Sequence, residues 1–360
     1  MESNSRRTQS NSSMLVLLIA VLISPACSIW WSIATRPMMD AMVLGTQPIC
    51  GQLEGLSRNQ RALCQRYANH MAHVSEGAGI GINECKWQFR GQRWNCSTVD
   101  DSSVFGKVLK IGSKETAFTY AISAAGVVVA VARACKNEQL ENCGCGNKAR
   151  PEGLDASWRW GGCGDNTEYA YGFAREFIDA RERDNISPKR RKDRERKVMN
   201  MHNNEAGRMV VVRSARPTCK CHGVSGSCSL KTCWMQVPGF REIGDELMRK
   251  YIGGVEVRVT NRGQLRPRRS NDEVGSTSLV YLDSSPDYCD KNRRTGVAGT
   301  KGRECKKDSS GPEGCGLLCC GRGFRTYRVR VVEKCECKFQ WCCSVKCNLC
   351  QRTVKRHICR

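Results

Sequence analysis

The sequence predicts an α+β protein in two parts: a helical amino-terminal domain with a projecting disulfide-stapled hairpin, and a small disulfide-rich β-hairpin domain at the carboxyl end. Three observations lead to this prediction. Apolar residues recur at helical spacing as far as about residue 252. Twelve of the 25 cysteines fall between Cys289 and Cys359, a stretch too short to build a large core without disulfides. Within that stretch, apolar and polar residues alternate as they do along half-buried strands.

The expected boundaries are a signal peptide at 1–28, a helical domain at 29–252 with the hairpin 219–233, a linker at 253–285, and a cysteine-rich domain at 286–360. In the linker, Val255, Val257 and Val259 alternate with charged residues and predict a strand.

The first residues have the pattern of a secretory signal. Arg6 and Arg7 precede an apolar run that is too short to cross a bilayer, and small residues follow it as far as Ser28. Cleavage after Ser28 would remove Cys27 and leave an even number of cysteines, which in a secreted chain indicates up to twelve disulfides. A cytosolic zinc protein is the competing interpretation, but there are only five histidines and no Cys pair precedes a His-x(3–5)-His spacing, so no metal site is expected.

The charge balance indicates a polyanionic partner outside the cell. The chain has 58 Lys and Arg against 35 Asp and Glu, a formal net charge of +23. Nucleic acid is excluded by the compartment, so sulfated glycosaminoglycans and anionic cell surfaces are expected instead. A solvated loop or helix end is the alternative explanation of the densest basic run. The candidate heparan sulfate contacts are Lys189, Arg190, Arg191, Lys192, Arg194, Arg266, Arg268 and Arg269.

Five helices are expected in the amino-terminal domain. The hydroxyl of Ser57 can accept a backbone N–H bond and so cap the first of them. The second has a half that is apolar all round, Ala124 to Ala132, which predicts a buried central helix and is too short to span a membrane. The expected ranges are Ser57 to Val74, Phe118 to Ala132, Asn166 or Thr167 to Ala180, Val198 to Val212, and the residues after Gly239 as far as Tyr251.

The hairpin of the helical domain is the most informative stretch of the chain. Its four cysteines are placed almost symmetrically about a centre rich in Gly and Ser. If Cys221 pairs with Cys228 and Cys219 with Cys233, the two bonds nest like rungs and Ser225 lies at the tip. A rigid loop that holds one hydroxyl toward solvent suits a modification site or a nucleophile. The alternative is a turn residue selected for its small size.

A second long hairpin is expected in the cysteine-rich domain. The run Tyr327 to Val331 alternates apolar residues with Thr and Arg, as a strand does. Pairing Cys335 with Cys350 and Cys337 with Cys347 again gives nested rungs.

The tip of this second hairpin is predicted to be a contact site. Cys342 and Cys343 fall at the tip and can form a vicinal disulfide, and Phe339, Trp341 and Val345 surround them. Apolar residues at an exposed tip are costly unless a partner binds them. The alternative is that Trp341 folds back on the hairpin.

The chain contains the segments Arg93 to Ser97, Gly161 to Asn166, His202 to Arg208, Cys219 to Cys233, Cys319 to Gly323 and Cys335 to Cys343. Together these segments resemble the Wnt family of secreted, lipid-modified signalling glycoproteins, and the resemblance runs from about Gln47 to Arg360. Phe118-Thr119-Tyr120-Ala121 and the segment Asp179 to Arg183 resemble the fifth class of that family.

The resemblance implies a molecule often likened to a hand, in which Ser225 lies on the thumb and Cys342-Cys343 on the index finger. Ser225 matches the family's acylated serine, to which a membrane-bound acyltransferase adds palmitoleate. This covalent lipid is the only bound group implied: no cofactor, metal or catalytic residue is expected, and the protein is not expected to be an enzyme. Both tips are expected to grip the cysteine-rich domain of a Frizzled receptor.

Further partners follow from the same resemblance. They are Ror- or Ryk-type or lipoprotein-receptor-related co-receptors, a dedicated membrane chaperone during secretion, and heparan sulfate proteoglycans. The expected location is the extracellular space and matrix. The expected output is signalling independent of β-catenin, in development, cell fate commitment and morphogenesis.

The resemblance also implies modifications and disulfides. Asn95 is an expected N-glycosylation site, whereas Asn185 is followed by Pro188, which disfavours modification. The implied pairs besides those above are Cys50–Cys64, Cys85–Cys96, Cys135–Cys143, Cys145–Cys163, Cys289–Cys320, Cys305–Cys315 and Cys319–Cys359, with Cys342–Cys343 as the twelfth.

Two other functions compete with a signalling ligand. A secreted serine hydrolase would use Ser225 with nearby His222, but the nucleophile elbow needs Gly where Ser227 stands. A matrix protein that only binds heparan sulfate would explain the charge and the disulfides but not two exposed tips.

Overall fold

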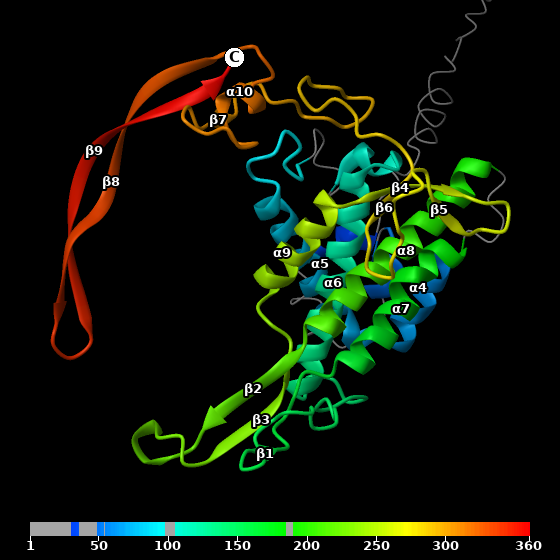
Figure 1. Cartoon of the computed structure of the whole chain (residues 1–360), viewed down its shortest axis with the longest axis vertical. Helices are drawn as coiled ribbons and strands as arrows, with labels where there is room; N and C mark the ends of the chain where they lie inside the picture. Colours follow the sequence, from blue (N-terminus) through cyan, green and yellow to red (C-terminus); the bar gives the residue numbers. More distant parts are fainter. Residues whose placement is uncertain (1–29, 36–48, 54, 98–104, 185–189) are drawn as a thin grey trace, which may run out of the picture.

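The computed structural model describes residues 30–35, 49–53, 55–97, 105–184 and 190–360 (Figure 1). The predicted signal peptide, Cys27, Asn185 and Lys189 lie outside the described residues.

The helical body is built around one central helix, α6 (Lys114–Lys136), which α5, α7, α8 and α9 surround (Figure 1). Its length and apolar composition would suit a membrane span, but 94% of its most apolar window is buried inside the body. Gly126 allows the close approach to α5, because a Cβ there would lie 2.1 Å from the carbonyl oxygen of Gly77. The predicted buried central helix is confirmed.

The other elements of the body are η1 (Trp30–Thr35), α3 (Ile49–Gln52), α4 (Arg58–Arg66), η2 (Ala68–His70), α5 (Met71–Gln88), η3 (Gly106–Lys110), α7 (Thr167–Asp184), α8 (Arg191–Ser214) and α9 (Phe240–Ile252).

The prediction of one continuous helix from Ser57 to Val74 is wrong, because two helices, α4 and α5, cover this range. Ser57 caps α4 as expected, in a reciprocal capping box with Gln60. The helix then ends at Tyr67, whose backbone leaves the helical region, and α5 starts four residues later. The break lets Tyr67 pack edge-on against His70 and against Phe173 of α7.

Helix α8 begins at Arg191, earlier than predicted, and it fastens the linker to the body. The Asn203 side chain donates to the carbonyl of Val280 (2.9 Å) and accepts from its N–H (3.0 Å), as a neighbouring strand would. His202 Nε2 lies 2.9 Å from the carbonyl oxygen of Ser278. The linker strands β4 (Val255–Val259), β5 (Leu265–Pro267) and β6 (Val280–Tyr281) form a sheet in the order β5-β4-β6. The alternating valines of β4 are buried, which confirms the predicted strand.

A buried ion pair joins α7 to α8. Arg208 donates to both carboxylate oxygens of Asp179 (3.0 and 2.9 Å) and to Glu205 (2.8 Å), and the Arg208 and Asp179 side chains are almost fully buried. Asn204 supplies a further bond to Asp179 (3.0 Å).

Replacing Arg208 with alanine should therefore destabilise the fold by about 3–5 kcal/mol, because Asp179 would be left buried without its cation. Urea unfolding of the disulfide-intact protein measures this change. Arg191→Ala on the same helix is the matched control, since its pair with Glu195 is exposed and should contribute only about 0.3–0.5 kcal/mol. Equal losses in the two variants would contradict the assignment.

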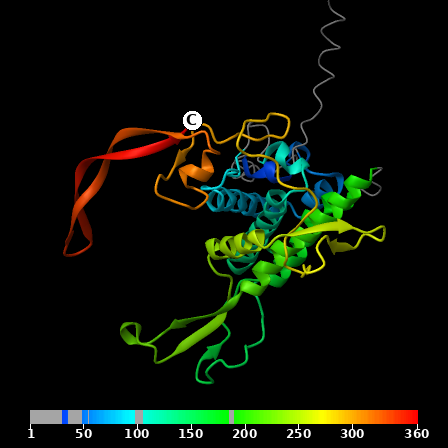
Figure 2. The same ribbon diagram turned by 45° about the horizontal axis from the view of Figure 1, so that its top comes forward.

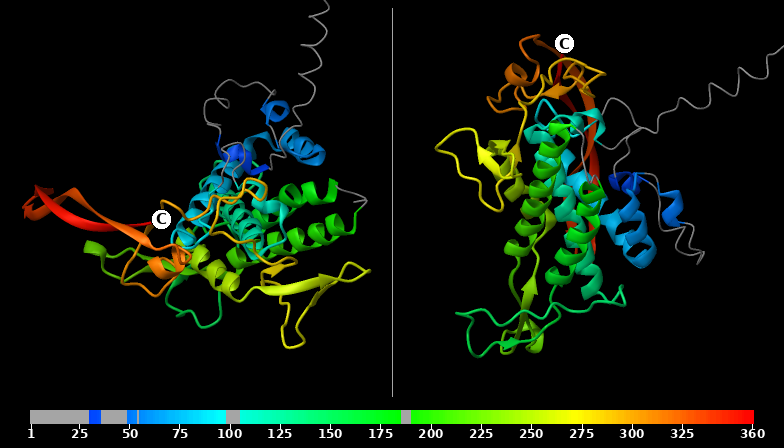
Figure 3. Two further views of the ribbon diagram at one scale, coloured as in Figure 1. Left: turned by 90° about the horizontal axis from the view of Figure 1, so that it is seen from above. Right: turned by 90° about the vertical axis from the view of Figure 1, so that its right-hand side faces the viewer.

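Two hairpins extend from the same side of the body, as Figures 1 and 2 and the view from above in Figure 3 show. The first, here called the thumb, consists of β2 (Arg216–Cys221) and β3 (Lys231–Gln236), with β1 (Arg159–Trp160) parallel to β3. The second, here called the finger, consists of β8 (Phe324–Gln340) and β9 (Ser344–Cys359). Strand β7 (Glu304–Cys305) pairs with the base of β9, beside the short helix α10 (Cys315–Leu318).

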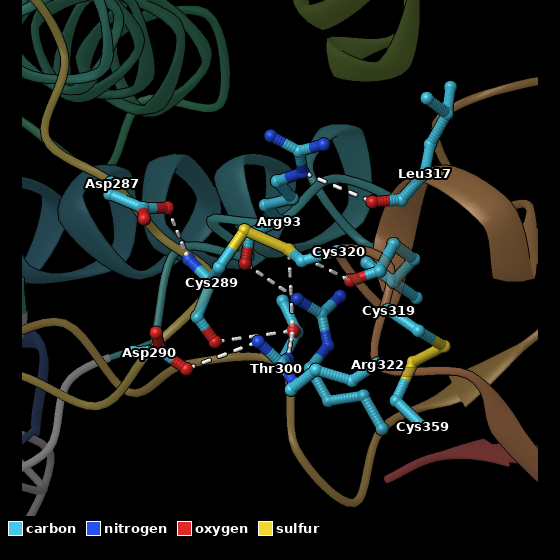
Figure 4. The surroundings of a disulfide bond; sticks show 12 residues. Arg93, Asp287, Cys289, Asp290, Thr300, Leu317, Cys319, Cys320, Arg322 and Cys359 are labelled. Atoms are coloured by element: carbon cyan, nitrogen blue, oxygen red, sulfur yellow. Dashed lines mark hydrogen bonds and ion pairs between the residues drawn. A yellow bond between two sulfur atoms is a disulfide. The ribbon is translucent and has the colours of Figure 1, made fainter.

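The base of the finger is held by a network around the Cys289–Cys320 disulfide (Figure 4). Arg322 bonds to Asp290 (3.1 Å) and to Thr300, whose hydroxyl donates to the Cys289 carbonyl. Arg93, from the loop after α5, donates to the carbonyl of Leu317 (3.2 Å). These bonds join the cysteine-rich segment to itself and to the helical body.

Eleven disulfides are present among the described residues, and each joins a pair named in the sequence analysis. The expected twelfth, Cys342–Cys343, is absent and is a correction: both residues are free thiols with sulfurs 3.3 Å apart. Adjacent Cα atoms across a trans peptide are about 3.8 Å apart, which is shorter than in the eleven bonded pairs, where the Cα atoms are 4.0–6.0 Å apart.

Candidate functional site

The base of the thumb is braced by the segment that leads into α7. Strand β1 pairs with β3 so that Trp160 lies opposite Cys233. Gly162 packs directly on the Trp234 ring, because a Cβ at this position would lie 2.5 Å from it. Asp165 is buried, accepts the N–H of Val237 (2.8 Å) and lies 3.7 Å from Lys136 Nζ. The thumb therefore leaves the body in a fixed direction.

The shaft of the thumb has the predicted nested disulfides. Cys219 and Cys233 are directly opposite each other across β2 and β3 and are bonded, and Cys221 bonds to Cys228 nearer the tip. A short turn, η4 (Val224–Gly226), closes the loop. The two disulfides restrict the backbone conformations open to the residues between them.

Ser225 lies at the tip of the thumb, as predicted, and its side chain is exposed. Its backbone is left-handed (φ 56°, ψ 26°), a conformation that costs a non-glycine residue free energy and persists only where the surroundings enforce it. Backbone bonds from Gly223 N to Ser227 O (2.8 Å) and from Ser227 N to Val224 O (3.1 Å) do so. Gly223 is required here, because a Cβ would lie 2.3 Å from the Ser227 carbonyl oxygen.

The arrangement around Ser225 does not favour hydrolysis. The loop lies between two strands of a hairpin, whereas a nucleophile elbow needs a strand-to-helix turn. Among the described residues, no hydrogen bond joins Ser225 to His222.

The tip of the finger exposes three large apolar side chains. Trp341 is 91% exposed, so it does not fold back on the hairpin, and Phe339 and Val345 are 70% and 61% exposed. Phe339 and Val345 are opposite each other, on one face of the ladder. Cys342 and Cys343 form the turn with positive φ angles, and a hydrogen bond with Cys342 raises the pKa of the Cys343 thiol.

Two exposed apolar residues near the tips were not among the contact residues predicted from the sequence. Val224, beside Ser225, is 90% exposed, and Leu349 on β9 is 72% exposed. Leu349 follows Val345 by four residues of a strand, so the even spacing places it on the same face and was a usable signal.

The remaining candidates lie away from the two tips. Asn95 is half-buried, and Cys96 within its sequon is bonded to Cys85. The described basic candidates, Arg190, Arg191, Lys192, Arg194, Arg266, Arg268 and Arg269, are exposed at the start of α8 and along β5 and the turn after it. Arg268 is paired with Glu256 (3.1 Å) and Arg191 with Glu195 (2.7 Å).

A helical body with two disulfide-braced hairpins that present exposed tips on one side defines a binding protein. Comparison with known proteins identifies the family to which this binding protein belongs. The sequence model of the Wnt family matches residues 52–360. "Protein Wnt-5" of Halocynthia roretzi is 56% identical over 330 residues, which cover 91% of each chain. "Protein Wnt-5a" of Ambystoma mexicanum is 53% identical over 350 residues, which cover 96% of this chain and 98% of the relative.

A solved structure agrees with these matches. A chain in "Human WLS in complex with WNT8A" is 37% identical with a TM-score of 0.59, and the match covers 82% of this chain and 95% of the solved one. The chain belongs to the Wnt family, whose members are secreted signalling ligands, and the two relatives named above are Wnt-5 proteins.

Proposed function

We propose that this Wnt protein is a lipid-modified ligand of Frizzled-type receptors, whose cysteine-rich domain it grips between thumb and finger. The observation that carries the proposal is the pair of braced tips on one side of the body, one with the exposed Ser225 and the other with Phe339, Trp341 and Val345. Nested disulfides brace the shaft of each hairpin, which lowers the conformational entropy lost on association.

The lipid is a palmitoleoyl group on Ser225, added by a membrane-bound acyltransferase. A sixteen-carbon chain offers about 0.8 kcal/mol per buried CH₂, or on the order of 10 kcal/mol as an upper bound. Because the nested disulfides fix the thumb, the acyl chain would enter a receptor groove from a fixed direction. The exposed Val224 beside it adds apolar surface to the same contact.

A protein with an exposed acyl chain requires a carrier during secretion. The solved complex of WNT8A with WLS supports a membrane chaperone of that type as a partner of this chain. Extracellular carriers would have the same task after release, since an exposed acyl chain makes the free protein poorly soluble.

Heparan sulfate proteoglycans are proposed as partners of the basic surface. A groove of about 480 Å³ lies between the first turns of α8 and the β4–β5 turn, with Arg191 and Arg194 among its lining residues. Arg258 and Arg266 are opposite each other across β4 and β5. Since like charges opposite each other repel, an anionic chain laid over them would relieve the repulsion. This contact would retain the ligand in the matrix.

The proposed output, based on the resemblance to the fifth class, is signalling independent of β-catenin, in development, cell fate commitment and morphogenesis, through Ror- or Ryk-type co-receptors. Lipoprotein-receptor-related co-receptors are the alternative. An N-glycan at Asn95 completes the proposed modifications, and closure of Cys85–Cys96 within the sequon would compete with its addition.

Binding to an isolated Frizzled cysteine-rich domain tests the proposal. The secreted chain should bind the immobilised domain with a Kd in the nanomolar range, about −12 kcal/mol. A free sixteen-carbon monounsaturated fatty acid should compete with it. An acylated chain that does not bind any Frizzled domain, or that binds without fatty-acid competition, would contradict the proposal.

A further inference from the structure

The last part of the finger has an apolar face. Phe339 is opposite Val345, and both are exposed on one face at the tip. Leu349 follows on the same face of β9 but is opposite Lys334, so the purely apolar part of this face is confined to the tip. Trp341 extends from the turn beyond them and is almost fully exposed. Exposing an apolar surface of this kind to water costs free energy. A partner that covers the surface recovers that free energy.

The other face of the same segment is basic. Lys338 and Lys346 are directly opposite each other in the ladder, where like charges destabilise a hairpin. The nine residues from Lys338 to Lys346 contain no acidic side chain. The nearest acid along β8, Glu336, already accepts a bond from Asn348 Nδ2 (2.8 Å). Among the described residues, neither Lys338 nor Lys346 takes part in an ion pair, although Glu336 keeps its charge two residues away.

Apolar residues on one face and lysines on the other are typical of segments that lie in the interface of an anionic bilayer. We propose that the finger tip, before it engages a receptor, is a docking site for an anionic lipid surface. Trp341, Phe339 and Val345 would sit at headgroup level, and the Lys338–Lys346 pair would contact the lipid phosphates. A sulfated glycan would match the lysines but would leave the apolar face uncovered.

The placement of the two hairpins strengthens the inference. Thumb and finger extend from the same side of the body (Figures 1 and 2), so both tips can meet one membrane. A single acyl chain gives only marginal and reversible membrane binding, and stable anchoring needs a second signal. The finger supplies that signal to a chain acylated at Ser225. This last step rests on the proposed acylation, whereas docking of the finger itself does not.

The test uses the full secreted chain with Ser225→Ala, which cannot carry the acyl group, and receptor-free vesicles. Cosedimentation compares phosphatidylcholine vesicles with vesicles that also contain phosphatidylserine. The Ser225→Ala chain should bind the anionic vesicles preferentially. Adding Lys338→Glu and Lys346→Glu should weaken that binding at least about tenfold, because each lysine near an anionic surface contributes about 1 kcal/mol. Trp341→Ser, which leaves the charge unchanged, should also weaken it.

The chain offers a matched charge control. Arg328 and Lys355 are also directly opposite each other, farther from the tip. Reversing both to Glu changes the net charge equally and should leave vesicle binding within about twofold of the parent. Equal loss in this control would show that overall charge attracts the protein, and it would overturn the proposal. Equal binding to neutral and anionic vesicles, or full binding by Trp341→Ser, would overturn it too. Because the vesicles hold no receptor, failure of the Frizzled proposal would not change these outcomes.

Discussion

Replacing Ser225 with alanine should abolish acylation and receptor activation while the protein remains folded. The Ser225 side chain is exposed, and the bonds that shape the loop come from the backbone of Gly223, Val224 and Ser227. Alanine can therefore replace it with little effect on the loop. If even a third of the upper-bound burial energy of the acyl chain is realised, its loss raises the Kd about 10²- to 10³-fold.

Receptor-domain binding, signalling in cells and thermal unfolding of the purified chain measure the three parts of this prediction. Ser227→Ala is the matched control, since the Ser227 hydroxyl makes only a long contact of 3.5 Å with Ser229. The control should keep the acyl group and the affinity. A Ser225→Ala chain that signals as the parent does would refute the role given to the thumb.

Removing the apolar side chains of the finger should produce the second largest effect. Phe339→Ala with Trp341→Ala should raise the Kd for the receptor domain about 10²-fold or more, because central aromatic anchors often contribute at least 2 kcal/mol each. The effect on fold stability should be small, since both side chains are mostly exposed in the free protein. Titration of the acylated variants against the purified receptor domain measures the change.

Tyr327→Ala provides the comparison on the shaft of the same finger, where the side chain is 37% exposed. It should change the Kd by less than about threefold if the contact is confined to the tip. If the tip variant and the shaft variant lose affinity equally, the finger binds along its length and the proposed contact is misplaced.

Much of the thumb could be predicted because its information is local. The four cysteines of the hairpin lie within fifteen residues, so their spacing alone nests the bonds and centres the loop on Ser225. The finger followed for the same reason, through strand alternation and two further nested pairs. The buried helix α6 was evident from a run that is apolar all round.

Features that depend on distant partners could not be predicted. The break at Tyr67 is set by aromatic packing on Phe173, more than a hundred residues away. The first turns of α8 are charged and carry no apolar periodicity, so the start of that helix could not be predicted. The parallel pairing of β1 with β3 likewise leaves no local sequence pattern. The vicinal disulfide was expected from adjacency and from the family resemblance, but the adjacent cysteines are unbonded in the turn.

The most direct test of the account is the mass of the secreted protein's peptide that contains Ser225. With the disulfides reduced and the chain digested, we predict a peptide whose mass is increased by one palmitoleoyl group, with fragment ions that place the group on Ser225. An unmodified peptide from a preparation that fully activates its receptor would contradict the central claim.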